Sequence, residues 1–348
     1  MKPIIKVLNS ELELVGLVDD YISLYFNNIF SDIGECKIEI SNSSENAPLL
    51  CKGAFLYLNT FECWIIEEIN IENNQLSITA LPLAFILKHR ITEPLQGQTH
   101  LNYSKKLTGY IMKDLIEKCL VKATDNKRNI NMITSTSNIG HKIDFQSRYR
   151  NLFDEIQKLS NYSAIGFRIG INIKERKFIL DIYQGQDLSE EVYFSEEFDN
   201  ITDIKITDSN LSYKNFIYVA GKGQGLERNI IKVDEGNYSG FNRREEMKDA
   251  RDKETTDELY VEADTILAEN TIKTSFEGIL IPDGTYKFEE DFKLGDIVTI
   301  ISKKYGYSYT QRITEYSKEY TTENGEVIEI IIGNPKPTLS FDKEEVIE

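Results

Sequence analysis

The side chains best suited to metal binding or to nucleophilic catalysis are scarce in this sequence. Of its 348 residues, three are histidines and four are cysteines. The histidines, which form no His-Glu-x-x-His pattern, are His89, His100 and His141. The cysteines, which form no Cys-x-x-Cys pair, are Cys36, Cys51, Cys63 and Cys119. These spacings predict neither a zinc site nor a disulfide framework, so we expect no catalytic residue, no metal and no cofactor.

A glycine-rich segment is the one motif that could cradle a phosphate group. Gly221, Gly223 and Gly225 alternate with other residues, and an apolar, strand-like run follows at 229–233. A dinucleotide fold instead needs Gly-x-Gly-x-x-Gly at the start of a helix. We therefore expect a turn or bulge between two strands. No Gly-x-Ser-x-Gly sequence occurs, so no serine nucleophile is marked.

Charge excludes several classes of partner. The chain has 40 basic and 57 acidic side chains, for a net charge of −17. This balance argues against gripping a nucleic-acid backbone or an anionic membrane. Residues 101–150 are the exception, with ten basic and four acidic side chains. That basic stretch is either a solvated helix face or a patch that docks an acidic surface, such as one on a neighbouring subunit.

Neither a leader nor a membrane span is expected. The first 18 residues contain Glu11 and Glu13 and lack a long apolar core, so they predict no signal peptide. No run of about 20 apolar residues is present, so we expect no membrane insertion.

The first 95 residues are predicted to be a β-rich domain. Short runs of branched and aromatic residues alternate with turn residues. The predicted strands are 3–8, 12–18, 36–40, 55–58, 63–71 and 76–80. Residues 21–30 are amphipathic and fit either a helix or a strand, and Asn73-Asn74 fits a hairpin tip. Strands at this spacing favour a sandwich or a barrel.

Residues 96–200 are predicted to be a mixed helix and strand domain. Leu107, Ile111, Leu115 and Cys119 recur every four residues, which predicts a helix capped by Ser104 and ending near Val121. A second helix is predicted over 149–159. Two further runs, 165–173 and 177–183, predict a hairpin that packs against the helices.

Residues 201–340 are predicted to form a second β-rich domain with a helical insertion. The predicted strands are 216–220, 229–233, 297–302, 311–316 and 327–332. The insertion consists of an intensely charged segment, 243–252, and a helix over 257–269. Asn324-Gly325 predicts a hairpin turn, and residues 341–348 form an acidic tail that we expect to fray.

Several short strings occur in an order that resembles a known family. They include a segment that ends in Arg-Ile-x-x-Pro at 81–94, the glycine-rich segment 215–228, and four later strings at 240–245, 249–252, 294–298 and 312–315. Their order resembles the siphovirus-type tail proteins related to phage baseplate hubs and to the N-terminal hub domain of tail-associated proteins. The resemblance extends from about residue 4 to about residue 334.

The resemblance implies a fold and an assembly. The fold would be α+β and mostly β, with two tube-like β-barrel domains and an intervening helix-containing α/β domain; strand exchange between the barrels stays open. The resemblance also implies a homotrimeric hub that joins a sixfold tail tube to a threefold spike or fibre. Its partners would be the tail tube protein, a spike or tail-tip protein and other baseplate proteins.

The same resemblance implies a location and a structural role. The protein would be made in the bacterial host cytoplasm and reside at the tail tip of the virion, as a structural protein without enzymatic activity. DNA would pass through the channel without specific binding. The net charge of −17 adds the hypothesis that acidic side chains of the two barrel regions face the lumen and repel DNA phosphates. The alternatives are a tail-associated cell-wall hydrolase and a carbohydrate-binding tail-tip protein, although no pair of the 57 acidic residues stands out for glycoside cleavage.

The strings also nominate residues for turns or subunit interfaces. These are Arg90, Pro94, Gly221, Gly223, Gly225, Arg228, Arg243, Arg244, Arg251, Gly295, Asp296 and Arg312. Arg90 and Pro94 are expected to redirect the chain after a core segment, and Gly295-Asp296 to turn it into the strand at 297–302. Arg243, Arg244 and Arg251 fit either a solvated helix face or pairing with carboxylates of the same or a neighbouring subunit.

Overall fold

A computed structural model describes residues 2–135, 137–251, 253, 255–282, 284–321 and 325–333. These residues separate into two compact units. Unit 1 comprises the described residues of Met1–Asp203 and Gly278–Ile330, and unit 2 comprises those of Ile204–Glu277 and Ile331–Glu348. The predicted boundaries at residues 95, 200 and 340 stay predictions, and the predicted acidic tail lies outside the described residues.

The chain passes between the two units inside strands. The strands that contain these crossings are β14 (Ile201–Ser209), β18 (Lys273–Leu280) and β21 (Gly325–Gly333). The first segment of unit 2, Ile204–Glu277, is therefore inserted into the sequence of unit 1, whereas its second segment follows the last residue of unit 1 along the chain. Of the predicted Asn324-Gly325 turn, only Gly325 lies within the described residues, where it begins β21 with a φ of 70°.

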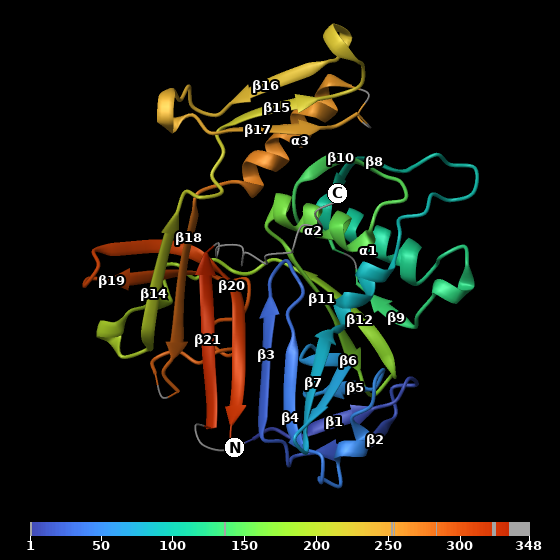
Figure 1. The fold of residues 1–348 in the computed structure, drawn as a ribbon, viewed down its shortest axis with the longest axis vertical. Coiled ribbons are helices and arrows are strands. Elements are labelled where there is room, and N and C mark those ends of the chain that lie inside the picture. Colours follow the sequence, from blue (N-terminus) through green and yellow to red (C-terminus); the bar gives the residue numbers. More distant parts are fainter. Residues whose placement is uncertain are drawn as a thin grey trace. The chain divides into compact units, whose positions relative to one another are not determined.

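A large sheet forms the β part of unit 1 (Figure 1). Its strands follow the order β20-β3-β4-β7-β6-β5-β1-β2, with β19 on the other part of β20 and β13 on β19. Their bounds are β1 (Ile5–Leu8), β2 (Leu14–Val18), β3 (Ser23–Ile29), β4 (Cys36–Ser41), β5 (Phe55–Tyr57), β6 (Cys63–Glu72), β7 (Gln75–Pro82), β13 (Tyr193–Phe194), β19 (Ile297–Ser302) and β20 (Tyr307–Thr321).

The strands predicted for the first 95 residues are confirmed, and the ambiguous segment 21–30 contains strand β3. Apolar side chains at every second position of β4 are buried, as a half-buried strand requires. Asn73 and Asn74 adopt φ values of 47° and 65°, which are the left-handed values that a tight hairpin between β6 and β7 needs.

The first and last parts of unit 1 meet at β3 and β20. These strands pair antiparallel from Ser23↔Thr321 to Ile29↔Glu315, and Figure 1 shows blue β3 beside red β20. The N-terminal half of β20 pairs with β19, so one long strand joins two groups of strands.

Two helices and two small sheets complete unit 1. The helices are α1 (Thr108–Leu120) and α2 (Leu152–Ser163). The small sheets contain β8 (Leu101–Leu107), β10 (Lys142–Ser147), β9 (Met132–Thr134), β11 (Gly166–Asn172) and β12 (Lys177–Tyr183). The β11–β12 hairpin is as predicted. Ile111, Leu115 and Ile156 are fully buried in one core with side chains of the small sheets.

Both predicted helix starts in this region are wrong. Ser104 caps no helix; it lies in β8 and its hydroxyl donates to Asp144 Oδ1 at 2.8 Å. The segment before α1 is a strand because it pairs with β10, an interaction that helical periodicity does not report. The second helix begins at Leu152, because the Asn151 side chain accepts from Phe153 N at 2.9 Å, and it ends at Ser163, beyond the predicted end.

Besides its parts of β14, β18 and β21, unit 2 contains a three-stranded sheet that packs against one helix. The strands of this sheet are β16 (Ile230–Asp234), β15 (Phe216–Ala220) and β17 (Glu245–Asp249), and the helix is α3 (Thr256–Glu269). Thr255 and Glu258 form a capping box at the start of α3. Every second residue of β15, Ile217 and Val219, packs in the core with Leu259.

The charged segment 243–252 contains a strand and not a helix. β17 pairs parallel with β15 from Phe216↔Glu245 to Ala220↔Asp249. Arg243 and Arg244 precede β17 and Arg251 follows it, so their interpretation as a solvated helix face is wrong. Charged residues fill β17 because it lies at an edge of this sheet, where charge is favoured.

The predicted α+β, mostly β class is confirmed, but the strand pairings of the described residues close no barrel. The remaining elements are short 3-10 helices: η1 (Ala47–Leu49), η2 (Leu83–His89), η3 (Asn126–Arg128), η4 (Glu196–Phe198), η5 (Gly225–Glu227) and η6 (Gly240–Asn242). None of the helices in the described part of the chain combines the length and apolar character needed to cross a bilayer.

We predict that Leu115→Ala lowers the free energy of unfolding by about 2–5 kcal/mol, because it removes a fully buried side chain from the core around α1. Urea unfolding followed by circular dichroism measures the change. Tyr110→Ala on an exposed part of the same helix is the matched control and should cost less than about 1 kcal/mol. Equal losses would contradict this account of the core.

Candidate functional site

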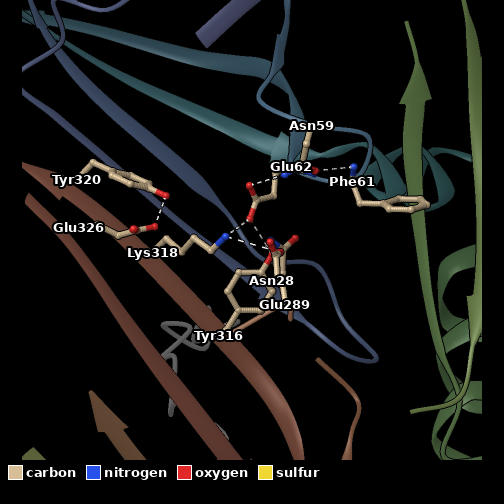
Figure 2. Close-up of polar contacts among 9 residues, drawn as sticks. All are labelled: Asn28, Asn59, Phe61, Glu62, Glu289, Tyr316, Lys318, Tyr320 and Glu326. Carbon is tan, nitrogen blue, oxygen red and sulfur yellow. Dashed lines mark hydrogen bonds and ion pairs between the residues drawn. The ribbon is translucent and has the colours of Figure 1, made fainter. Parts of the chain in front are cut away.

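A buried ion pair joins two distant parts of the unit 1 sequence (Figure 2). Lys318 of β20 places its Nζ 2.7 Å from Glu62 Oε1, and both residues are almost fully buried, at 6% and 5% exposed. Glu62 lies in the turn between β5 and β6. The pair therefore joins a turn of the N-terminal part of the sheet to a C-terminal strand.

Further polar groups satisfy this pair. Asn59 Nδ2 donates to Glu62 Oε2 at 2.7 Å, and the Tyr316 hydroxyl donates to Oε1 at 3.2 Å. Asn28 Nδ2 in turn donates to the Tyr316 hydroxyl at 2.8 Å. Burial raises the pKa of Tyr316 well above its ordinary value, and the charge of Glu62 raises it further. The tyrosine therefore acts as a hydrogen-bond donor.

A second carboxylate approaches the same ammonium group. Glu289 Oε1 lies 3.6 Å from Lys318 Nζ. Burial raises the pKa of Glu289, whereas the Lys318 charge lowers it. Two carboxylates, a lysine and a tyrosine could form an acid–base group, but Glu62 and Lys318 are too buried for a substrate to reach. We therefore interpret Glu62, Lys318, Tyr316 and Glu289 as a structural cluster, called the clamp below, that holds β20 against the turn between β5 and β6.

The nominated glycine segment forms a tight turn in unit 2. It links β15 to β16, as predicted, and Gly221 N donates to Asn229 O at 2.8 Å. Gly223 has a φ of 115°, and a Cβ there would lie 2.7 Å from Glu227 O. Gly225 has a φ of 56° with open space around it. The conformations open to Gly223 and Gly225 build this turn.

Arg228 ties this turn together. Its Nε donates to Gly221 O at 3.0 Å, and its Nη2 donates to Ala220 O at 2.9 Å and to Asp249 Oδ1 at 2.6 Å. Arg251 adds a weaker contact to the same carboxylate, with Nε 3.3 Å from Oδ2. One carboxylate of β17 therefore anchors two of the nominated arginines within this unit.

Arg243 and Arg244 lie at the other end of β17. The Arg243 guanidinium lies over the Phe216 ring, 3.6 Å from its centroid, and its Nε donates to Glu245 at 2.5 Å. Arg244 N donates to Asn215 Oδ1 at 2.8 Å, and its Nη1 donates to Asn210 O. Arg243 therefore pairs with a carboxylate of this chain, which is one form of the pairing that the sequence left open, whereas Arg244 bonds a backbone carbonyl.

Gly295, Asp296 and Arg312 come together at the start of β19. Asp296 is 1% exposed, and its two carboxylate oxygens accept from Gln186 N at 2.8 Å and Lys293 N at 2.9 Å. Arg312 Nη1 donates to Gly295 O, and burial lowers the pKa of this arginine while the Asp296 charge raises it. The predicted turn into β19 is confirmed, and Asp296 organises it.

Arg90 and Pro94 lie apart from these groups. Arg90 follows η2, as expected for the end of a core segment, and its carbonyl accepts from Leu152 N at 2.9 Å. Pro94 lies in the irregular segment before β8. A role at a subunit interface stays a prediction for all twelve nominated residues.

The clamp was missed by the sequence analysis. Glu62 and Lys318 are 256 residues apart, and neither belongs to a motif. One signal was present: Lys318 alternates with Tyr316 and Tyr320 on β20, so it occupies a buried position in the pattern. Within the described residues, no group of three or more His, Cys, Asp or Glu side chains could hold a metal ion.

The fold described above is shared with solved tail proteins. The prophage tail protein gp18 of Listeria monocytogenes aligns with 97% of this chain and 95% of its own, at 16% identity and a TM-score of 0.57. The 43 kDa tail protein of prophage MuSo2 from Shewanella oneidensis aligns with 94% and 98%, at 10% identity and a TM-score of 0.61. A tail protein of Neisseria meningitidis aligns with 95% and 97%, at 13% identity and 0.58. This chain therefore has the fold of a prophage tail protein.

Family membership follows from the sequence itself. A family-wide profile matches residues 4–334, and the chain belongs to the family described as Siphovirus ReqiPepy6 Gp37-like protein. A comparison with curated proteins finds no match. The resemblance to siphovirus-type tail proteins that the ordered strings predict is confirmed, over the same range of residues.

We predict that Glu62→Gln lowers the free energy of unfolding by about 3–5 kcal/mol, because it leaves the buried Lys318 ammonium group without its main partner. The double variant Glu62→Gln/Lys318→Met should lose much less than the sum of the two single variants. Urea unfolding of the four proteins gives the coupling. Additive losses, or a loss as large for the exposed Glu72→Gln, would rule out the clamp.

We predict that Gly223→Ala destabilises unit 2 more than Gly225→Ala does. In Gly223→Ala the new Cβ clashes with the backbone, and the φ of this position is unfavourable for residues with a side chain, so the free energy of unfolding should fall by about 1–3 kcal/mol or more. In Gly225→Ala the new Cβ meets open space, so the loss should be about 1 kcal/mol. Hydrogen exchange at the amides of β15 and β16 measures the difference. The reverse order would show that the turn is not held as described.

Proposed function

We propose that this protein is a structural hub at the distal end of a phage tail or a phage-tail-like particle. The observation that carries the proposal is the shared fold, which extends over 94–97% of this chain and 95–98% of three solved tail proteins. Membership in a siphovirus protein family supports the same role. The protein acts as a building block and not as an enzyme.

In this proposal three copies form a ring that joins the sixfold tail tube to a threefold spike or fibre. The large sheet of unit 1 contributes to two tube-like barrel domains that line the channel. The ring contacts the tail tube protein, a spike or tail-tip protein and other baseplate proteins. It resides at the virion tail tip after synthesis in the host cytoplasm.

The acidic composition fits a channel for DNA. Each copy carries a net charge of −17, and acidic side chains of the barrel regions that face the lumen would repel phosphates within about 10 Å. DNA then slides past without specific binding. A lumen with a neutral or basic surface would contradict this part of the proposal.

We predict that native mass spectrometry of the assembled tail tip finds three copies of this 40.1 kDa chain, and that electron microscopy of particles with a tagged chain locates it at the distal end. Particles that carry a tag on the tail tube protein are the control for labelling along the tube. Absence of this chain from the tail tip would overturn the proposal, whereas a monomer of the isolated protein would not.

A further inference from the structure

Part of the basic stretch that the sequence singles out is neutralised internally. On α1, Lys113 pairs with Glu117 at 3.4 Å and Lys118 pairs with Asp114 at 2.5 Å. These pairs join residues four apart on one helix, which is the ordinary way for a solvated helix to balance its charge. The α1 lysines therefore leave little net positive charge on that helix.

A different set of cations from unit 1 lines a shallow recess that opens broadly to solvent. Its walls come from the end of η2 with the residues after it, and from η3 with the residue before it. The lining residues are His89, Arg90, Ile91, Asp125, Lys127 and Arg128. Three of these side chains are permanently positive and one is negative. The recess is therefore cationic in a chain whose net charge is −17.

One of the two guanidinium groups of the recess, that of Arg90, is only partly satisfied. Arg90 Nη1 donates to the carbonyl of His89 at 3.1 Å, its Nε is buried without a hydrogen-bond partner, and it makes no ion pair with any described residue. Burial lowers the pKa of Arg90, and the Arg128 charge lowers it further, which reflects two like charges close together.

Arg128 is held in place by the protein itself. Its Nη1 donates to Glu93 Oε2 at 2.7 Å and its Nη2 donates to Ile91 O at 2.6 Å. Lys127 makes no ion pair with any described residue, and only its backbone N is used, donating to Asp125 Oδ1 at 3.0 Å. Arg90 and Lys127 are thus the cations of the recess that lack an anionic partner.

We propose that this recess is an anion-binding site that accepts a carboxylate from an acidic segment of another protein chain. Guanidinium groups bind carboxylates through paired, charge-assisted hydrogen bonds. The open shape admits a side chain presented by a protein surface. The carboxylate of Asp125, which also lines the recess, repels a doubly charged phosphate more strongly than a singly charged carboxylate.

The experiment uses the full chain and a fluorescent hexaglutamate peptide, with hexaglutamine as the uncharged control. Fluorescence anisotropy should detect hexaglutamate binding at low salt, and the affinity should fall as salt rises, because exposed charges are screened. Hexaglutamine should not bind. Equal binding of the two peptides, or no binding of hexaglutamate, would overturn the proposal.

Three variants locate the binding. Arg90→Lys keeps the charge but removes the planar fork and should weaken hexaglutamate binding about tenfold, and Lys127→Gln should weaken it about threefold. Lys52→Gln makes the same charge change at an exposed position elsewhere in unit 1 and should have no effect. Because Lys127 is exposed, its variant tests the site even if Arg90→Lys unfolds. Unchanged affinity in Lys127→Gln would overturn the proposal.

Inorganic phosphate at matched ionic strength distinguishes the two sources of an oxyanion. Phosphate should displace hexaglutamate only weakly, to the extent that ionic strength explains. Displacement by phosphate at concentrations far below those of chloride, lost in Lys127→Gln, would identify a phosphate site and overturn the carboxylate assignment.

Discussion

The ion pair between Glu62 and Lys318 is the interaction on which the rest of unit 1 depends. Lys318 is only 6% exposed, and burying a charged side chain is costly unless an opposite charge lies at hydrogen-bond distance. The carboxylates that meet it come from the turn after β5 and from Glu289, whereas the lysine comes from β20. The pair therefore fixes which face of β20 points inward. It also fixes the register in which β20 pairs with β3. A shift of one residue would turn Lys318 outward and bring Glu319 in.

Much of the fold could be predicted because local patterns report local structure. The alternation in β4, the asparagines at 73 and 74 and the four-residue spacing around Leu115 all identify their elements. β8 and β17 could not be predicted in the same way. Both are strands because a partner far along the chain pairs with them: residues 101–107 pair with β10, and residues 245–249 pair with β15. Their own sequences, rich in lysine or glutamate, carry little strand preference.

The nominated residues show the same division. Turns at glycines with positive φ, such as Gly223, follow from elementary stereochemistry, and so does the turn at Asp296. The sequence alone was therefore sufficient to predict these turns. The arginines required the structure, because a guanidinium finds its partner in space. Arg228 reaches two carbonyls and a carboxylate of its own unit, and Arg243 covers an aromatic ring. The charge of residues 101–150 likewise could not reveal that Lys127 and Arg90 meet at one recess, since the two lie 37 positions apart.

The pairing of β3 with β20 has a consequence for how the molecule is made. The Asn28 and Tyr316 side chains that meet there are 288 residues apart. At a synthesis rate of 5–20 residues per second, β20 is synthesised roughly 15–60 s after β3. During that interval one edge of the nascent sheet presents unpaired backbone groups, which invite association with other chains. The speed of translation and the protection that chaperones give to the nascent chain thus affect how many chains fold intact.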